Sequence, residues 1–311
     1  MKIVVTGCAG FIGSHAVDEF LESGHQVLGI DKLTYAGDLR NLDVALKNSE
    51  FSFVKSDITD TTVIKSFLRE FKPDWLINFA AETHVDNSII SISEFIHSNI
   101  NGVACLLESI QGTGTRFCQI STDEVYGDIK VGKFSEDDSL NPKNPYSATK
   151  AAAEHIVTSH HNTYDTQYLI VRPSNNFGPR QNSEKFMPKS IRCLIEGKKI
   201  PVYGDGSNVR EWTYVRDTAR AVRFLVEKDR INEVYNISSE YQQSNIKTVE
   251  SICREMSLNP ANVVNFVPDR PGHDWRYSIG SEKLRSLGFL IESDFNQNLK
   301  DTIEWIRSNK R

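Results

Sequence analysis

Short apolar runs alternate with longer amphipathic stretches along the first half of the chain. The short runs predict buried strands at residues 2–6, 25–31, 51–57, 73–80, 116–122 and 166–174. Apolar positions at helical spacing predict helices at residues 11–24, 61–71, 93–111 and 146–164. Strands that alternate with helices in this way indicate βαβ units, and therefore a parallel sheet covered by helices on both faces.

The pattern loosens after residue 180, where prolines and glycines separate shorter elements. We expect a strand at residues 234–238 and helices near residues 215–228, 247–257 and 297–308. The predicted fold class is therefore α/β: a Rossmann-type, doubly wound parallel sheet with a smaller C-terminal substrate-binding lobe. Residues 1–174 are assigned to the sheet domain, which also carries the catalytic residues. Residues 175–311 are assigned mainly to the lobe, interleaved with the sheet.

Composition narrows the class of protein. The chain has 311 residues, of which 39% are hydrophobic and 25% charged, and this balance suits a large folded domain rather than a disordered chain. A net charge of −5 argues against a general nucleic-acid binder. The five cysteines are scattered without a CxxC pair, so we expect neither a disulfide framework nor a metal site. No apolar run approaches the roughly 18 residues of a membrane span, and we expect a cytoplasmic protein without a membrane partner.

A glycine-rich turn follows the first predicted strand. Gly7, Gly10 and Gly13 are spaced three residues apart in "TGCAGFIG", between a strand and a helix. Glycine allows the backbone to approach a pyrophosphate closely, and the helix start offers unpaired N–H groups. Asp31 ends the second strand, where an acidic residue accepts ribose hydroxyls and repels a 2′-phosphate. The pattern predicts NAD, rather than NADP, as the cofactor of residues 1–174; a turn that binds nothing is the alternative.

Further cofactor contacts are expected beside this turn. Asp57 and Ile58 end the third strand and are candidates for an adenine pocket, although a helix cap explains them nearly as well on spacing alone. The predicted cofactor-binding residues are Gly7, Gly10, Phe11, Ile12, Gly13, Asp31, Asp57, Ile58, Ala80, Tyr146 and Lys150.

Tyr146 and Lys150 lie four residues apart in "YSATK", at the start of a predicted helix. Residues at this spacing share a helix face, and an ammonium beside a phenol favours the phenolate, which can take a proton near neutral pH. An ordinary surface pair is the alternative. Together with the glycine turn and with Ser121 and Thr122 at the end of the fifth strand, the pair resembles the extended, sugar-nucleotide form of the short-chain dehydrogenase/reductase superfamily.

Several motifs extend this resemblance over nearly the whole chain. They are "DKLTYAGDLRNL" (31–42), "AAETHVDNSI" (80–89), "STDEVYGD" (121–128), "NPYSATKAAAEH" (144–155), "RPSNNFGPRQ" (172–181), "VREWTYVRDTARA" (209–221) and "DRPGHDWRY" (269–277). Their residues and their order are similar to those of the dTDP-glucose 4,6-dehydratases.

The resemblance implies a reaction that requires two adjacent acids. NAD⁺ oxidises a hexose at C4, a base removes the C5 proton while an acid assists loss of the C6 hydroxyl as water, and the hydride returns to C6. By motif, Asp123 is the acid and Glu124 the base, and two carboxyls can share this work if their environments separate their pKa values. Thr122 would bond the C4 hydroxyl, Tyr146 would deprotonate it and Lys150 would hold the nicotinamide ribose. For Asp123 and Glu124, the alternative is an exposed acidic turn.

The same resemblance implies a set of substrate-binding residues. In the family, cations and amides hold the diphosphate of the substrate, and arginine suits bidentate contacts with phosphate. Other residues of the set would contact the nucleotide base and the sugar. The predicted set is Thr83, His84, Asn175, Pro201, Tyr203, Arg210, Asn245 and Arg276. A surface ion pair is the alternative for each arginine, and His84 is explained equally well as a structural histidine.

Other functions stay open at this stage. UDP-glucose or another nucleotide hexose is an alternative substrate, because the methyl group of thymine is worth roughly 1 kcal/mol or less of discrimination. A sugar-nucleotide epimerase or decarboxylase, or a non-catalytic NAD-binding protein, could use the same scaffold. Family likeness also implies a homodimer formed by the helices at residues 93–111 and 146–164; two helices that simply cover the sheet are the alternative.

Overall fold

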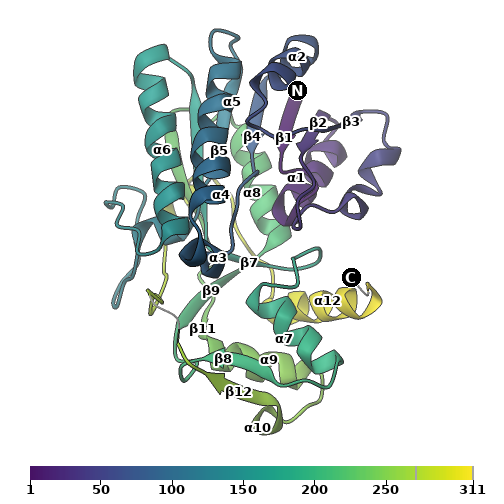
Figure 1. Cartoon of the computed structure of the whole chain (residues 1–311), viewed down its shortest axis with the longest axis vertical. Coiled ribbons are helices and arrows are strands. Elements are labelled where there is room, and N and C mark those ends of the chain that lie inside the picture. The colour runs from purple at the N-terminus through teal and green to yellow at the C-terminus, as the bar shows by residue number, and fades with distance from the viewer. Residues whose placement is uncertain (270–271, 310–311) are drawn as a thin grey trace.

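A seven-stranded parallel sheet forms the centre of the molecule in a computed structural model that describes residues 1–269 and 272–309 (Figure 1). The order β10-β6-β5-β4-β1-β2-β3 confirms the predicted Rossmann-type fold. The strands are β1 Lys2–Thr6, β2 Gln26–Asp31, β3 Phe51–Lys55, β4 Trp75–Asn78, β5 Arg116–Ile120, β6 Tyr168–Pro173 and β10 Glu233–Ile237. Positions 270 and 271 of the predicted "DRPGHDWRY" motif lie outside the described residues.

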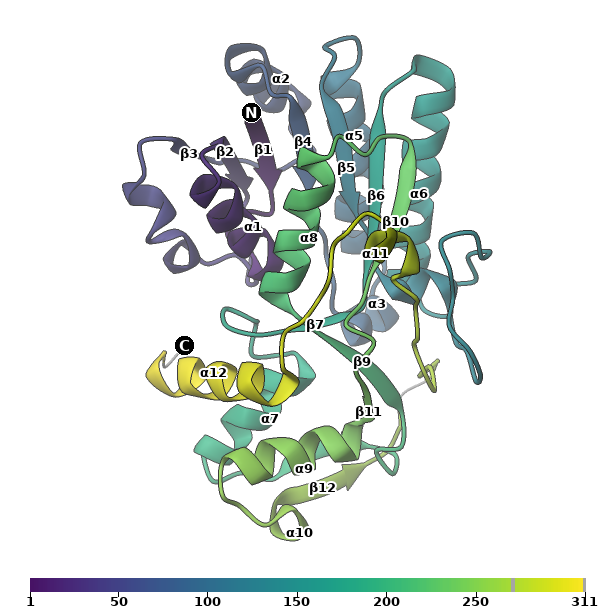
Figure 2. The ribbon, with the colours of Figure 1, turned by 180° about the vertical axis from the view of Figure 1, so that it is seen from behind.

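Helices cover both faces of this sheet, as the alternating pattern predicts. One face carries α2 Thr61–Phe71, α5 Gly102–Ile110 and α6 Pro145–Tyr164, which are seen in front of the sheet in Figure 1. The other face carries α1 Phe11–Glu22, α8 Val215–Glu227 and α11 Glu282–Ser286, seen in Figure 2. Each face has its own hydrophobic core, so the central strands are apolar on both sides.

The helix expected at residues 93–111 is interrupted. It consists of α4 Ser93–Phe95, a π-helical turn Ile96–Asn101 and α5, preceded by the short helix α3 Val85–Ile90. Within the π-helical turn, the Asn99 amide bonds both backbone groups of Glu82 and, at 3.0 Å, the hydroxyl of Thr149. These contacts accompany the widened turn, and π-helical turns of this kind are frequent at functional sites.

The strand expected at residues 234–238 belongs to the central sheet, because β10 pairs with β6 at its edge. The remaining elements after residue 174 form a smaller lobe with its own core, at the bottom of Figure 1. They are β7 Asn175–Phe177, α7 Phe186–Ile195, β8 Ile200–Tyr203, β9 Val209–Tyr214, β11 Gln242–Ser244, α9 Asn245–Glu255, α10 Pro260–Val263, β12 Val264–Val267 and α12 Phe295–Ser308. They include a three-stranded sheet β11-β9-β7 and a two-stranded sheet β12-β8.

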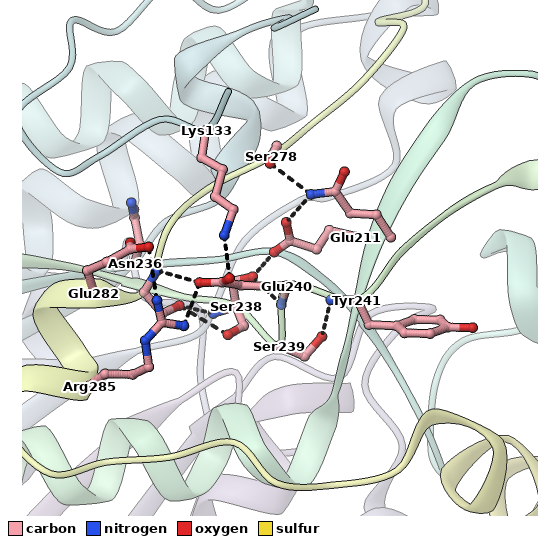
Figure 3. A network of polar contacts seen from close by, with 12 residues as sticks. Lys133, Glu211, Asn236, Ser238, Ser239, Glu240, Tyr241, Ser278, Glu282 and Arg285 are labelled. Atoms are coloured by element: carbon pink, nitrogen blue, oxygen red, sulfur yellow. Dashed lines mark hydrogen bonds and ion pairs between the residues drawn. The ribbon is translucent and has the colours of Figure 1, made fainter. Parts of the chain in front are cut away.

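A polar network joins this lobe to the central sheet (Figure 3). The carboxylate of Glu240 accepts hydrogen bonds from Lys133 and Arg285, and that of Glu211 accepts them from Ser238 and Gln242. Glu211 is fully buried, and burial raises its pKa to about 8. The network therefore ties together four segments that are far apart in sequence.

No helix in the described part of the chain is long and apolar enough to cross a membrane.

A buried ion pair connects the central elements. The Arg172 guanidinium on β6 donates at 2.6 Å to Glu154 on α6 and at 2.6 Å to the hydroxyl of Tyr126. The side chains of Arg172 and Glu154 are only 6% and 3% exposed. Tyr126 ends the short 3₁₀ helix η4 Asp123–Tyr126, so the ion pair connects the acidic turn to the helix that carries Tyr146 and Lys150.

We expect Glu154→Ala to destabilise the protein by about 3–5 kcal/mol, because it leaves the Arg172 charge buried without a partner. Urea denaturation measures the change. Glu196→Ala is the matched control, since it removes a carboxylate from an exposed pair with Lys198 and should change stability little. Equal effects of the two substitutions would contradict the expectation.

Candidate active site

The candidate site is a cavity at the C-terminal ends of the central strands. Its volume is about 290 Å³, and it runs from the glycine turn to the start of α6. Parallel α/β sheets bind ligands at this edge, where the connections diverge. All of the residues predicted to bind the cofactor line this cavity: Gly7, Gly10, Phe11, Ile12, Gly13, Asp31, Asp57, Ile58, Ala80, Tyr146 and Lys150.

The glycine turn packs without room for side chains. Gly7 has a φ of +65°, and a Cβ there would lie 2.6 Å from the backbone nitrogen of Ala80. A Cβ on Gly13 would lie 2.2 Å from the carbonyl oxygen of Gly7. The glycines therefore let the first turn of α1 sit directly over the ends of β1 and β4, where backbone N–H groups face the cavity.

Two acidic residues, Asp31 and Asp57, also line the cofactor part of the cavity. The Asp31 carboxylate accepts N–H bonds from Ala9 at 3.0 Å and Leu33 at 2.7 Å, and burial raises its pKa. Asp57 accepts from Thr59 and pairs with Lys32 at 3.3 Å. The N-cap of α2 is Asp60, so Asp57 does not cap that helix and remains a candidate for the adenine pocket.

Four residues that line the cavity carry a buried side-chain atom without a hydrogen-bond partner among the described residues. These atoms are Ser121 Oγ, Asn175 Oδ1, Asn176 Oδ1 and Gln181 Oε1. Buried polar groups are normally paired, so these four atoms favour a polar ligand at this position. The glycine turn, Asp31 and these acceptors together fit a dinucleotide.

Lys150 and Tyr146 lie on the first turns of α6. Asn144 caps this helix, with its side-chain oxygen accepting the N–H of Ser147 at 2.9 Å. Lys150 Nζ donates to the Ile120 carbonyl at 2.5 Å, and burial lowers its pKa to about 8.

The predicted phenolate at Tyr146 is not supported. Burial and the nearby Glu124 carboxylate raise the pKa of Tyr146, which is the opposite of the direction inferred from the Tyr–Lys spacing. The reason is geometric: the Lys150 ammonium bonds the Ile120 carbonyl, whereas the charge of Glu124 acts on the phenol.

The two adjacent acids occupy different environments in η4. Thr122 caps this turn, accepting the N–H of Glu124 at 3.3 Å and donating to Asp123 at 3.2 Å. Asp123 is 2% exposed, and burial and the charge of Glu124 raise its pKa well above the ordinary value. Glu124, together with Thr122, lines the cavity. The more deeply buried carboxyl therefore has its pKa raised, while its neighbour lines the cavity. The exposed-turn alternative is wrong because both side chains are buried.

The structure brings only part of the predicted substrate set into the cavity. Thr83 and Asn175 line it. Arg210 lies behind, stacked 4.6 Å from the ring centre of Tyr277 and bonded to the Asp274 carbonyl at 3.0 Å. The Arg276 side chain bonds Gln242 and the carbonyl of Gly132.

Four further predicted substrate residues also lie outside the cavity lining. Asn245 is the buried first residue of α9, with its backbone N–H on Asn208. Pro201 and Tyr203 lie on β8, and the Tyr203 hydroxyl donates to Asp86 at 3.1 Å. His84 caps α3 by accepting the N–H of Asn87, which supports its structural alternative.

Sequence reasoning missed Asn144, Asp274 and Tyr277, which surround Glu124. Asn144 donates to Glu124 Oε2 at 3.1 Å, and the Tyr277 hydroxyl lies 3.4 Å from the same oxygen. The quoted motifs contain all three residues, but only folding brings Tyr277 to a turn 153 positions away in sequence.

Known proteins resemble the chain over its whole length. The sequence profile of the GDP-mannose 4,6 dehydratase family matches residues 4–302. The low-salt glycan biosynthesis protein Agl12 of Haloferax volcanii is 45% identical over 98% of both chains. The dTDP-glucose 4,6-dehydratase of Actinoplanes sp. is 40% identical over 100% of this chain and 99% of its own. A solved structure is also similar: DesIV, a dTDP-glucose 4,6-dehydratase of Streptomyces venezuelae, with NAD and TYD bound. It superposes on this chain with a TM-score of 0.96 and is 36% identical in sequence. The match covers 100% of this chain and 98% of the DesIV chain.

We expect Gly13→Ala to weaken NAD binding by roughly tenfold or more, because the added Cβ pushes α1 away from the Gly7 carbonyl. Isothermal titration with NAD measures this change. Gly24→Ala is the control: it follows the same helix at a φ of +77° with open space around it, so it should affect stability and not the affinity for NAD. Unchanged affinity in folded Gly13→Ala would contradict the assignment of this turn.

Proposed function

The chain belongs to the dTDP-glucose 4,6-dehydratase family of NAD-dependent nucleotide-sugar dehydratases, and on this premise we propose that it converts dTDP-glucose to dTDP-4-keto-6-deoxyglucose and water. The observation that carries the proposal is the different environment of two adjacent acids, Asp123 and Glu124, beside Tyr146 and Lys150. Asp123 is buried with a raised pKa, while Glu124 faces the cavity. A dehydration needs both an acid and a base, and pairs of carboxyls with separated pKa values supply them.

Oxidation at C4 is assigned to three residues at the cavity wall. Bound NAD⁺ supplies the hydride acceptor. Thr122 hydrogen-bonds the C4 hydroxyl, and Tyr146 takes the proton of that hydroxyl when its phenol is ionised. Lys150, with a pKa near 8, is a buried cation that holds the ribose of the nicotinamide and can favour loss of the phenol proton once its ammonium turns from Ile120.

Elimination is assigned to the η4 turn. The C4 ketone acidifies the C5 proton, which Glu124 removes. Asp123, held in its neutral form by burial, gives its proton to the C6 hydroxyl as water leaves. Hydride from the reduced cofactor would then add to C6, while Glu124 returns its proton to C5, which completes the 4-keto-6-deoxy sugar. An epimerase needs only the oxidation and its reversal, so it would have no use for a buried acid paired with a cavity-facing base.

The nucleotide preference rests on likeness. Relatives at 39–40% identity carry the name dTDP-glucose 4,6-dehydratase, which favours thymidine over uridine. UDP-glucose, or another nucleotide hexose, is the second candidate. Thr83 and Asn175 are proposed to meet the bound sugar nucleotide because they line the cavity. His84, Pro201, Tyr203, Arg210, Asn245 and Arg276 stay predictions for substrate contacts, as does the cytoplasmic location.

Incubation of the purified protein with dTDP-glucose and UDP-glucose in competition tests the proposal, with products identified by mass spectrometry and NMR. We expect a 4-keto-6-deoxy product, mainly from dTDP-glucose. Asp123→Asn should lower product formation by about 100-fold or more while C4 oxidation, seen as reduced cofactor, continues. Asp137→Asn, an exposed acid on the following loop, should leave both steps unchanged.

Two results of this assay would contradict the proposal in different ways. Recovery of a C4 epimer without loss of water would favour the epimerase. If no nucleoside diphosphate hexose yields a product, the dehydratase assignment fails.

We propose a homodimer in which the contacts are made by α6 and by the helical segment at residues 93–111. Exposed and half-buried positions Ala148, Ala152, His155 and Ser159 recur at helical spacing on one face of α6. Ile96, in the neighbouring π-helical turn, is 38% exposed. Small residues on α6 would let two such faces pack closely against each other.

Sedimentation velocity at micromolar concentration should give a dimer. Ala152→Glu, which places a charge on this face, should shift the protein to a monomer, whereas Ser66→Glu on the exposed side of α2 should not. A wild-type monomer would reject the dimer.

A further inference from the structure

The carboxylate of Glu124 is held by two side chains that the reaction scheme leaves unused. Asn144 Nδ2 donates to Oε2 at 3.1 Å, while the oxygen of the same amide caps α6 at Ser147. The Tyr277 hydroxyl approaches Oε2 at 3.4 Å. Both contacts use Oε2, so Oε1 is the oxygen left for the ligand space, and the base is fixed relative to the helix that carries Tyr146.

Asp274 stands directly behind Tyr277. Their side chains are 5% and 2% exposed, and the Tyr277 hydroxyl lies 2.5 Å from Asp274 Oδ2, closer than it lies to Glu124. Arg210 stacks on the Tyr277 ring and donates to the Asp274 backbone carbonyl. Two buried carboxyls therefore share one phenolic proton.

The segment that carries this pair is held from outside the site. Ser278 accepts a hydrogen bond at 2.8 Å from the Gln242 amide, which also donates to buried Glu211 at 3.2 Å (Figure 3). The Arg276 backbone N–H donates to Asp128 at 2.7 Å. Hydrogen bonds thus hold both sequence neighbours of Tyr277, Arg276 and Ser278. The Tyr277 hydroxyl therefore has little freedom to move away from the two carboxyls.

Titratable and charged groups around Glu124 come from η4, α6, β9 and the segment that carries Asp274 and Tyr277. Burial raises the pKa of Asp274, and the Glu124 charge raises it further. Burial also raises the pKa of Tyr277, which keeps this group a hydrogen-bond donor. The titratable and charged groups that act on Glu124, directly or through Tyr277, are Asp123, Tyr146, Tyr277, Asp274 and Arg210.

We propose that Asp274 is a positioning residue that acts through Tyr277 to control the orientation and protonation of Glu124. The inference rests on the proposed function only in naming Glu124 as the base. When Glu124 is ionised, its carboxylate competes with Asp274 for the Tyr277 proton. When Glu124 carries the proton taken from C5, Tyr277 donates to Asp274 alone. Asp274 thereby favours uptake of the proton by Glu124.

The test is a titration of the Glu124 carboxyl by carbon-13 NMR in the NAD-loaded protein, with its signal assigned from Glu124→Gln. Asp274→Asn removes the charge that competes for the phenolic proton and repels Glu124, so ionised Glu124 is favoured and the midpoint should fall by roughly half a pH unit to one unit. Tyr277→Phe removes a donor to the ionised form, so the midpoint should rise by a similar amount.

A merely structural role would not produce shifts of opposite sign. Asp137→Asn is the matched control and should leave the midpoint unchanged, and thermal melting of each variant establishes that it is folded. Shifts in the same direction, or none in folded variants, would overturn the proposal. The titration requires no turnover, so its outcome is independent of the dehydratase assay; with an active enzyme, the acidic limb of the pH–rate profile for water loss should move in the same two directions.

Discussion

The buried ion pair between Arg172 and Glu154 is the constraint on which the site depends. Arg172 belongs to β6, Glu154 to α6, and the same guanidinium bonds Tyr126 at the end of the acidic turn. A buried charge is tolerable only with its partners in place, so the three elements can occupy one arrangement. Tyr146 and Lys150 on α6 and the two acids on η4 are therefore held in fixed positions relative to one another.

In this arrangement, two neighbouring carboxyls have different environments. Asp123 points into the protein, where the low dielectric and the charge of Glu124 oppose its ionisation. Glu124 points to the cavity and finds Asn144 and Tyr277 as donors. A 3₁₀ turn achieves this because successive side chains on it point in different directions. Two consecutive carboxyls can thus have different surroundings.

Residues from the C-terminal part of the chain help to form the surroundings of Glu124. The segment with Asp274 and Tyr277 reaches the acidic turn from the C-terminal part of the chain, and the network around Glu211 and Glu240 supports it (Figure 3). Glu124 lies in the part of the chain assigned to the sheet domain, and its immediate surroundings come from both parts.

The parallel α/β sheet, the glycine turn with Asp31 and the Tyr146–Lys150 helix could be predicted from the order of residues alone, since periodicity and short spacings are local properties of a chain. Three features became visible only in the folded molecule: the π-helical turn within the helix expected at residues 93–111, the place of β10 at the edge of the central sheet, and the contacts of Arg210 and Arg276 with protein groups. The tertiary structure also decided that Tyr146 lies under the influence of Glu124. These features depend on which side chains meet across long sequence separations, where burial and unpaired charge, rather than local pattern, set the free energy.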